Sequence, residues 1–306
     1  MRADQVLSSR VEEFGAKRAL HWVDRDRSLT YGEASDSMNR AATVFRGFGV
    51  AEGSCVGVLA HPGLDYVTVL LGAWRLGAAA AVVDLRAKND FRSIMSRVSP
   101  DAIVYTNDHF DFVRPIGAEP SSVRVYAGMD GPQELAIGWP ESLASADPLE
   151  SSPEPGDASD EDVRVAMRYF SAEESTMSAI THGELLRRSS RVVDRLGMES
   201  DDITMCPTPM SQPFHLISSI LPSLAVGGTA GMLKSWQPSS GWQSMEDHGT
   251  TILCGSPTHC ADLLDVARDR GARPSSLRMA VTYDGDGVDE LVNGYRDELE
   301  IDLAVI

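Results

Sequence analysis

The residues from Tyr169 to Leu186 have the outline of a phosphate-binding loop but lack its chemistry. Such a loop needs glycines, so that backbone N–H groups can approach a polyphosphate, and a cation that neutralises the incoming charge. Glu173 and Glu174 occupy the tip instead, and no Lys or Arg occurs from Phe170 to Leu186. Two like charges 4 Å apart repel by about 1 kcal/mol in water and by about 4 kcal/mol in a partly buried site. We therefore expect this stretch to disfavour nucleotide binding.

The stretch resembles the phosphate loop of the adenylate-forming superfamily, which contains acyl-CoA synthetases, adenylation domains of non-ribosomal peptide synthetases and luciferases. In that family a strand ends in Tyr-Thr-Ser-Gly-Thr-Thr-Gly-x-Pro-Lys-Gly, and a Thr-His pair follows on the next helix. Tyr169 and Ser171 match the start, Thr181 and His182 match the later pair, and the segment between them is about two residues short. The family's Gly, Thr-Thr and Lys positions carry other residues. The positions interpreted as a degenerate phosphate loop are Ser171, Glu173, Glu174, Ser175 and Thr176.

Other segments resemble the same family in the same order along the chain. They are 29–33, 39–40, 49–56, 72–78, 213–215, 227–229, 251–257 and 277–282. The resemblance implies an α/β fold with two consecutive doubly wound sheet-and-helix subdomains, as in the N-terminal part of adenylate-forming enzymes. In segment 72–78 it implies small residues that let a helix pack closely on a sheet. Relatives continue into a turn that holds adenine and magnesium and into a C-terminal domain with a catalytic lysine, so we expect a truncated member.

The hydrophobic pattern gives the same fold class. Short apolar runs at 55–60, 78–83 and 102–105 alternate with helical periodicity at 31–48, 64–76 and 90–98, which predicts a doubly wound sheet. Residues 141–162 are rich in Ser, Pro, Asp and Glu and show no periodicity. We expect a boundary there, between a first subdomain at 1–162 and a second at 163–306. An acidic loop inside one domain is the alternative.

Charge and composition limit the partners. The formal net charge of -18 disfavours nucleic acid and anionic membrane surfaces, because both would be repelled at range. No run reaches the roughly 18 apolar residues that a membrane helix needs, and no secretion signal is evident. A cytoplasmic location is expected, with the four cysteines as thiols.

The resemblance also implies site residues. The family's counterpart of His215 lies between the phosphate loop and the acyl pocket, so His215 is expected to act as a general base or to orient a thioester carbonyl. A core histidine behind Phe214 is the alternative. Cys254 could be a nucleophile or a buried thiol, and Glu173 and Glu174 could serve as metal ligands or as acid and base, or be solvated. His182 is expected to be structural. The expected substrate-binding residues are Phe214, Ser218, Gly255, Ser256 and Tyr283.

Three functions remain open. The first is an enzyme that has lost ATP-dependent activation and transfers, cyclises or hydrolyses a pre-activated acyl thioester of CoA or a carrier protein. The second is a non-catalytic partner or scaffold for a carrier protein or a full-length synthetase. The third is half of a split ligase. No cofactor is expected, because the ATP and magnesium site of the family is degenerate, and no metal site is expected. A homodimer or a synthetase partner is possible.

Overall fold

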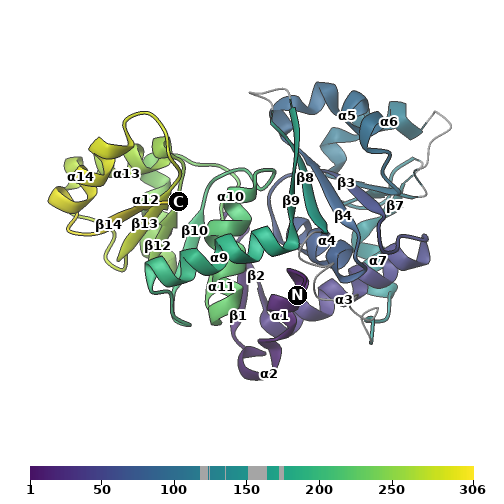
Figure 1. The fold of residues 1–306 in the computed structure, drawn as a ribbon, viewed down its shortest axis with the longest axis horizontal. Helices are drawn as coiled ribbons and strands as arrows, with labels where there is room; N and C mark the ends of the chain where they lie inside the picture. The colour runs from purple at the N-terminus through teal and green to yellow at the C-terminus, as the bar shows by residue number, and fades with distance from the viewer. Residues whose placement is uncertain (118–122, 124, 135, 151–163, 172–175) are drawn as a thin grey trace. The chain divides into compact units, whose positions relative to one another are not determined.

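The computed structural model describes residues 1–117, 123, 125–134, 136–150, 164–171 and 176–306. The chain forms two compact units, shown in Figure 1. Unit 1 contains residues 1–11, 32–185 and 211–213, and unit 2 contains residues 12–31, 186–210 and 214–306. The units are therefore interleaved along the chain.

Unit 1 is built on a seven-stranded sheet of order β7-β6-β5-β3-β4-β8-β9. Its strands are β3 (Cys55–Leu59), β4 (Ala79–Val83), β5 (Ala102–Tyr105), β6 (Val125–Gly128), β7 (Ile137–Gly138), β8 (Val165–Ser171) and β9 (Thr176–Thr181). All neighbours pair in parallel except β8 with β9. The sheet strands β3 and β5 are apolar throughout and fully buried, as expected when helices cover both faces.

The helices of unit 1 fill the connections between these strands. They are α1 (Asp4–Ser8), α3 (Tyr31–Gly47), α4 (Leu64–Arg75), α5 (Phe91–Val98), α6 (Phe110–Gly117) and α7 (Trp139–Ser145), with short 3₁₀ turns at η2 (Leu85–Asp90) and η3 (Asn107–His109). Helices α5 and α6 pack on each other and form a core with β3, β4 and β5. A Cβ added to Gly72 of α4 would lie 2.5 Å from Ala41 Cβ of α3. The missing side chain of Gly72 therefore lets α4 pack closely on α3, whereas a close contact with the sheet was expected.

Unit 2 contains a second seven-stranded sheet, of order β14-β13-β12-β10-β11-β1-β2. Its strands are β1 (Arg18–Trp22), β2 (Arg27–Thr30), β10 (Ile203–Cys206), β11 (Thr229–Met232), β12 (Ile252–Cys254), β13 (Met279–Thr282) and β14 (Asp302–Val305). Only β1 and β2 pair antiparallel. The helices are α2 (Val11–Phe14), α9 (His182–Leu196), α10 (Pro213–His215), the π-helix η4 (Leu216–Ile220), α11 (Leu221–Val226), α12 (Pro238–His248), α13 (Pro257–Arg270) and α14 (Val288–Glu298), and the remaining short turn is the 3₁₀ helix η1 (Val23–Arg25).

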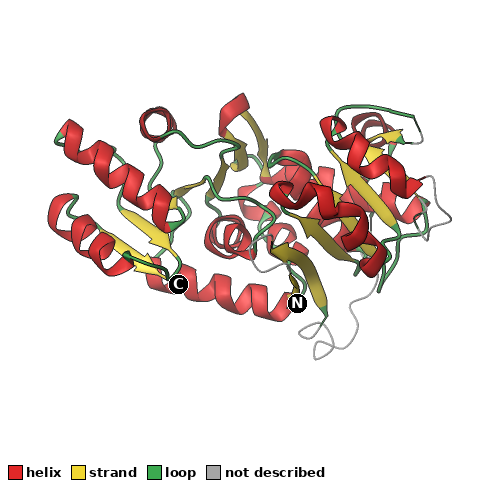
Figure 2. Cartoon of the chain, turned by 90° about the horizontal axis from the view of Figure 1, so that it is seen from above, coloured by secondary structure: helices red, strands yellow, loops and turns green. Residues whose placement is uncertain are grey.

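Helices lie on both faces of this second sheet (Figure 2). Helices α12, α13 and α14 pack side by side and share a core with β10, β12, β13 and β14. Parallel crossover connections are right-handed. The helical segment between β10 and β11 therefore covers the face opposite these three helices.

Each sheet contains a point between two neighbouring strands where the winding direction reverses. In unit 1 the chain moves from β3 to β4 on one side and then returns to β5 on the other, and in unit 2 it moves from β10 to β11 and then returns to β12. Ligands of doubly wound sheets bind outside the carboxyl ends of the strands at such reversal points. A ligand site is therefore expected at the residues that follow β3 and β5 in unit 1, and at those that follow β10 and β12 in unit 2.

The predicted fold class is confirmed, with two doubly wound sheets and flanking helices. The predicted boundary after residue 162 differs from the observed division, because β8 pairs with β4 and thereby belongs to unit 1. Most of the expected linker at 141–162 lies outside the described residues, but 141–145 belong to α7. Within the described ranges, no helix combines the length and the apolar character needed to cross a bilayer. All four cysteines are free thiols, as predicted.

Candidate functional site

His215 lies at the reversal point of the second sheet, on the helix that follows β10. Its side chain has no exposed surface. Nδ1 lies 2.9 Å from the backbone carbonyl oxygen of Thr208. A carbonyl oxygen only accepts hydrogen bonds, so the proton of the neutral ring is on Nδ1 and Nε2 carries a free lone pair. Nε2 is buried and has no hydrogen-bond partner in the described structure.

Burial also fixes the charge of this imidazole. It lowers the pKa of His215 to about 4, against the smaller opposing effect of the hydrogen bond to Thr208. The ring is therefore neutral near pH 7. A neutral imidazole with an unpaired Nε2 in an apolar setting can accept a proton from a nucleophile, or accept a hydrogen bond from a ligand.

The helix that carries His215 has irregular geometry. The π-helix η4 follows directly, and Pro222 then stands in the first turn of α11. Proline lacks the N–H that an α-helix uses. Single π turns are frequently found at functional sites. The helix that carries His215 is therefore not a continuous α-helix, because a π turn separates His215 from this proline.

Cys254 is the last residue of β12, the strand that pairs with β10. Its Sγ donates to the backbone carbonyl oxygen of Ser218 at 3.2 Å. Burial raises the pKa of the Cys254 thiol well above its usual value, because no cation compensates for the loss of water around a thiolate. The thiol is therefore protonated and hydrogen-bonded, which disfavours the nucleophile role considered for Cys254.

Phe214 and Tyr283 are brought together although they are far apart in the sequence. Their ring centroids are 5.0 Å apart and the rings meet edge to face. Tyr283 directly follows β13 and 41% of it is exposed. Ser218 donates its hydroxyl to the carbonyl oxygen of Phe214 at 2.7 Å. Two of the expected substrate-binding residues thus form an aromatic pair, while Ser218 is engaged with its own helix.

The turn after β12 is a helix start. Ser256 accepts a hydrogen bond from the backbone N–H of His259 and caps α13, and the His259 ring in turn accepts from the Ser256 backbone N–H. A Cβ at Gly255 would lie 2.9 Å from the Cβ of His259, so only glycine fits. Gly255 and Ser256 shape the backbone beside the site and leave no free hydroxyl there.

The degenerate phosphate loop joins β8 to β9 in unit 1. Ser171 and Thr176 pair at the end of β8 and β9 where this loop begins and ends. Glu173, Glu174 and Ser175 lie outside the described residues. At the other end, the Thr181 hydroxyl accepts from the Glu184 backbone N–H at 3.1 Å and begins α9.

His182 sits in the core of unit 1. Its Nδ1 accepts from the Ala3 backbone N–H at 3.2 Å, and its ring meets the Trp74 ring edge to face. Burial lowers the pKa of His182 to about 3. These contacts are those of a structural residue.

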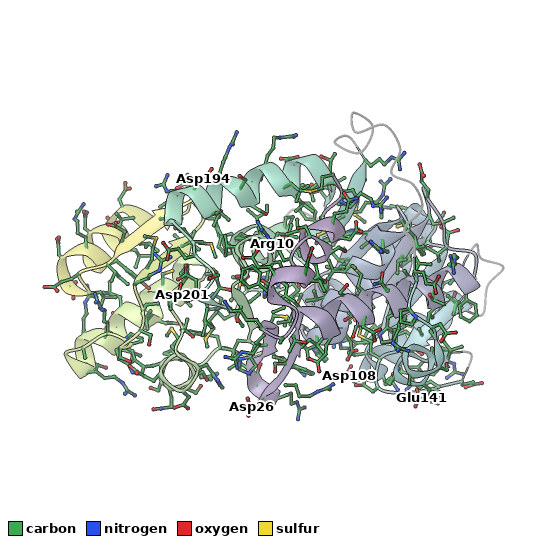
Figure 3. All side chains as sticks on the ribbon, turned by 90° about the horizontal axis from the view of Figure 1, so that it is seen from below. Arg10, Asp26, Asp108, Glu141, Asp194 and Asp201 are labelled. Atoms are coloured by element: carbon green, nitrogen blue, oxygen red, sulfur yellow. The ribbon has the colours of Figure 1, made fainter. Side chains whose placement is uncertain are left out.

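Two groups of histidine and aspartate were not singled out from the sequence. They are His21, Asp26 and His248 in unit 2, and His61, Asp108 and His109 in unit 1. Asp26 and Asp108 are labelled in Figure 3. The sequence did contain an indication of the second group. His61 and Asp108 each follow a predicted buried strand, and neighbouring parallel strands have their carboxyl ends at the same edge of a sheet.

The fold is that of a doubly wound α/β core, with polar residues after β10 and β12 at the reversal point of the second sheet. Residues 7–169 and 177–299 match the model of the AMP-binding enzyme family. The chain belongs to that family.

Individual relatives agree with this family. The chain is 25% identical over 289 residues to a 4-coumarate–CoA ligase of Oryza sativa subsp. japonica, covering 92% of this chain and 51% of that protein. It is 24% identical over 277 residues to a feruloyl-CoA synthase of Amycolatopsis sp, covering 88% and 52%. The chain thus spans about half the length of the curated relatives that it matches.

Solved structures share the fold. A crystal structure of an anthranilate CoA ligase in complex with anthranoyl-AMP superimposes with a TM-score of 0.88 at 18% identity, covering 99% of this chain and 59% of that one. A benzoate CoA ligase from Burkholderia xenovorans superimposes with a TM-score of 0.84 at 18% identity, covering 99% and 60%.

Proposed function

We propose that this member of the AMP-binding enzyme family acts on an acyl group that reaches it already activated as a thioester, without using ATP. His215 would serve as the general base. The observation that carries the proposal is the state of this side chain: Nδ1 is held by the Thr208 carbonyl, and Nε2 is a buried, unpaired acceptor at the reversal point of the sheet.

The sequence of the loop between β8 and β9 supports the absence of an ATP requirement. Glu173 and Glu174 stand at the tip of this loop, and other residues stand where the family has the glycines and the lysine that would contact a triphosphate. After β13, Asp284 and Asp286 add two exposed carboxylates where the family pattern has Gly-Gly. Each of these substitutions raises the cost of bringing a polyphosphate close. A thioester needs no adenylation, so an enzyme that uses one tolerates all of them.

The proposed reaction uses only one proton acceptor. Nε2 of His215 takes a proton from water or from the hydroxyl or amine of an acceptor molecule as its oxygen or nitrogen attacks the thioester carbonyl carbon. The C–S bond then breaks, and the proton on Nε2 returns to the leaving thiolate. The backbone carbonyl of Thr208 holds the Nδ1–H throughout, which keeps the ring in the correct tautomer.

An aromatic acyl group is the preferred substrate class. Phe214 and Tyr283 form an edge-to-face pair next to the site, and such pairs offer ring edges and faces to a further aromatic ring. The relatives named for 4-coumarate and feruloyl-CoA support the same class.

The test combines binding and turnover. Thermal unfolding is followed with ATP, with coumaroyl adenylate and with 4-coumaroyl-CoA, since a ligand of the native state raises the midpoint. Turnover of 4-coumaroyl-CoA, benzoyl-CoA and octanoyl-CoA is followed by thiol release. We expect a shift with the CoA ester, none with ATP, and the fastest release from an aromatic ester.

His215→Asn is the decisive variant. An Asn amide keeps a donor near the Nδ1 position for the Thr208 carbonyl but has no counterpart of Nε2. We expect it to fold, to bind the ester and to lose about 10²-fold or more of the turnover, while Cys254→Ser keeps its turnover. Undiminished turnover in His215→Asn, or micromolar affinity for ATP, would contradict the proposal.

The complete burial of His215 favours a second candidate, a non-catalytic module that binds an acyl thioester or its carrier protein. It predicts the same thermal shift with the CoA ester but no thiol release by either the unsubstituted chain or His215→Asn. The turnover assay therefore separates the two functions.

A further inference from the structure

A second polar site lies at the reversal point of the first sheet, far along the sequence from His215. Strands β3 and β5 are parallel neighbours, with Leu59 opposite Tyr105 at their carboxyl ends. His61 stands two residues beyond β3, and Asp108 stands three residues beyond β5. The topology thus brings together two segments separated by 47 residues along the chain.

Three side chains converge there. Nε2 of His61 lies 2.7 Å from Oδ2 of Asp108, and Nδ1 of His109 lies 3.6 Å from Oδ1 of the same carboxylate. The two imidazole rings are 4.8 Å apart between centroids. One donor atom from each residue lies within 4.8 Å of the other two. Two imidazole nitrogens and a carboxylate oxygen are a typical ligand set for a divalent transition metal.

His109 supplies a separate observation. Only 5% of this residue is exposed, yet neither of its ring nitrogens has a hydrogen-bond partner in the described structure. A buried polar group without a partner costs about 1–3 kcal/mol. A metal ion between His109 and Asp108 would satisfy Nδ1, the ring nitrogen that lies next to the carboxylate.

The backbone around these ligands is held in place. Asn107 donates its backbone N–H to Asp130 at 2.8 Å and its side-chain amide to the Gly131 carbonyl at 3.2 Å. His109 donates its backbone N–H to the Thr106 carbonyl at 2.9 Å. The turn that carries two of the three ligands is therefore fixed by the segment after β6, which lowers the entropy lost when an ion binds.

From this geometry we propose that His61, Asp108 and His109 bind a divalent transition metal ion of the Zn²⁺ type. With Zn–N and Zn–O distances of about 2.0–2.2 Å, tetrahedral ligands lie roughly 3.3 Å from one another. The distance between His109 and Asp108 needs little change. The His61–Asp108 hydrogen bond opens by about half an ångström as the metal replaces its proton.

Three protein ligands leave a fourth position of a tetrahedral ion for water or an anion. Asp108 is 58% exposed on its side chain, so this position faces solvent. Lys88 lies close enough to His109 to oppose a cation electrostatically. The single negative charge of Asp108 offsets the positive charge of Lys88. The site is therefore expected to bind metal reversibly rather than to hold it as a permanent part of the fold.

The test uses the full chain, stripped of metal with a chelator and titrated with Zn²⁺ by calorimetry. His248→Gln is present in every sample, so that the cluster of His21, Asp26 and His248 loses one ligand. We expect one ion per chain. Asp108→Asn and His61→Gln should each weaken binding at least about tenfold. Asp111→Asn is the matched control, because this exposed residue carries the same charge nearby but lies outside the cluster, and it should bind as before.

Co²⁺ provides a readout that does not depend on affinity. Four-coordinate Co²⁺ with nitrogen and oxygen ligands has visible absorption that the six-coordinate aqueous ion lacks. We expect this absorption in the chain with Asp111→Asn and its loss with Asp108→Asn. Equal binding and equal spectra in these two variants, or no binding at millimolar metal, would overturn the proposal.

Discussion

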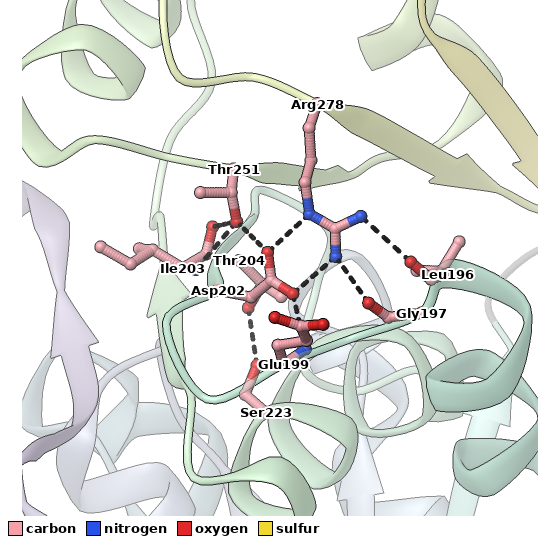
Figure 4. Close-up of polar contacts among 9 residues, drawn as sticks. All are labelled: Leu196, Gly197, Glu199, Asp202, Ile203, Thr204, Ser223, Thr251 and Arg278. Atoms are coloured by element: carbon pink, nitrogen blue, oxygen red, sulfur yellow. Dashed lines mark hydrogen bonds and ion pairs between the residues drawn. The ribbon is translucent and has the colours of Figure 1, made fainter.

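Arg278 and Asp202 form a two-pronged ion pair at the amino ends of the second sheet (Figure 4). Nε donates to Oδ1 at 2.8 Å and Nη2 donates to Oδ2 at 2.6 Å. Asp202 precedes β10 and Arg278 precedes β13, and the hydroxyl of Thr251, which precedes β12, also donates to Oδ1 at 2.7 Å. One carboxylate thus joins the starts of three parallel strands. His215 lies at the opposite, carboxyl edge, so stability and chemistry occupy different ends of this sheet.

Replacing Asp202 by Asn should destabilise the protein. The guanidinium of Arg278 also donates to the Leu196 and Gly197 carbonyls and would remain there without its countercharge. The Asp202 side chain is buried but 37% of the Arg278 side chain is exposed, so loss of the carboxylate should cost about 1–3 kcal/mol. Urea denaturation should give this loss in Asp202→Asn and a smaller one in Arg278→Lys, because lysine keeps the charge but not the paired geometry. Equal stability of Asp202→Asn and the unsubstituted chain would show that the pair contributes nothing.

Gly72 and Gly47 should respond to alanine in opposite ways. At Gly72 the new methyl would lie 2.5 Å from Ala41 Cβ and 3.2 Å from the Ala41 carbonyl carbon, so α3 and α4 must move apart, at a cost of about 1–3 kcal/mol. At Gly47, in the last turn of α3, nothing lies within 4 Å, and alanine should stabilise by up to about 1 kcal/mol. Thermal unfolding of the two variants checks the sign. A stabilising Gly72→Ala would mean that the helices are less closely packed than they are here.

The cysteines should not react in the native protein. Burial raises the pKa of the Cys55, Cys206 and Cys260 thiols to about 12 and that of Cys254 well above its usual value, and all four are buried. Alkylation with iodoacetamide at pH 8 should leave the native chain unmodified and label four sites in guanidinium chloride. Selective native labelling of Cys254 would restore the nucleophile role.

The sequence predicted the two sheets because each buried strand is a short apolar run between turns, as at 55–60, and each motif kept its order along the chain. It could not predict where unit 1 ends, since the pairing of β8 with β4 is a long-range contact that local periodicity does not encode. Neither did it predict the π-helix, although Pro222 inside an apolar helix marked the irregularity.

For the predicted site residues, the sequence indicated which side chains lie near one another but not which hydrogen bonds they form. Phe214 and Tyr283 are in contact, as a shared site requires. The roles of Ser256 and Cys254 depend on hydrogen bonds, to His259 and to the Ser218 carbonyl, that no spacing specifies. The His61 cluster was missed because its members belong to different strand ends and form no local motif.

Stability should fall in mild acid, before the carboxylates titrate. Burial holds the pKa of His182 at about 3 and that of His215 at about 4, whereas an unfolded histidine has a pKa of about 6.5. The folded pKa is depressed, so the stabilisation is complete above pH 6.5 and is lost as the pH falls towards the folded value, because the unfolded chain takes up protons that the folded chain does not. Each histidine contributes up to about 1.4 kcal/mol per pH unit in this window.

His182→Asn separates this effect from other sources of acid sensitivity. An Asn carbonyl can still accept from the Ala3 backbone N–H but cannot titrate. Between pH 6.5 and 4.5 the variant should therefore lose about 2 kcal/mol less than the unsubstituted chain, measured by urea denaturation at four pH values. His215→Asn should behave in the same way in unit 2, and the pair of variants should add, since the two residues belong to separate cores. Asp202 does not interfere in this window, because its hydrogen bonds with Arg278 help to hold its pKa below the usual value and its contribution is lost only at lower pH. Parallel pH profiles of His182→Asn and the unsubstituted chain would contradict this prediction. They would mean that His182 becomes protonated over the same pH range in the folded and the unfolded chain.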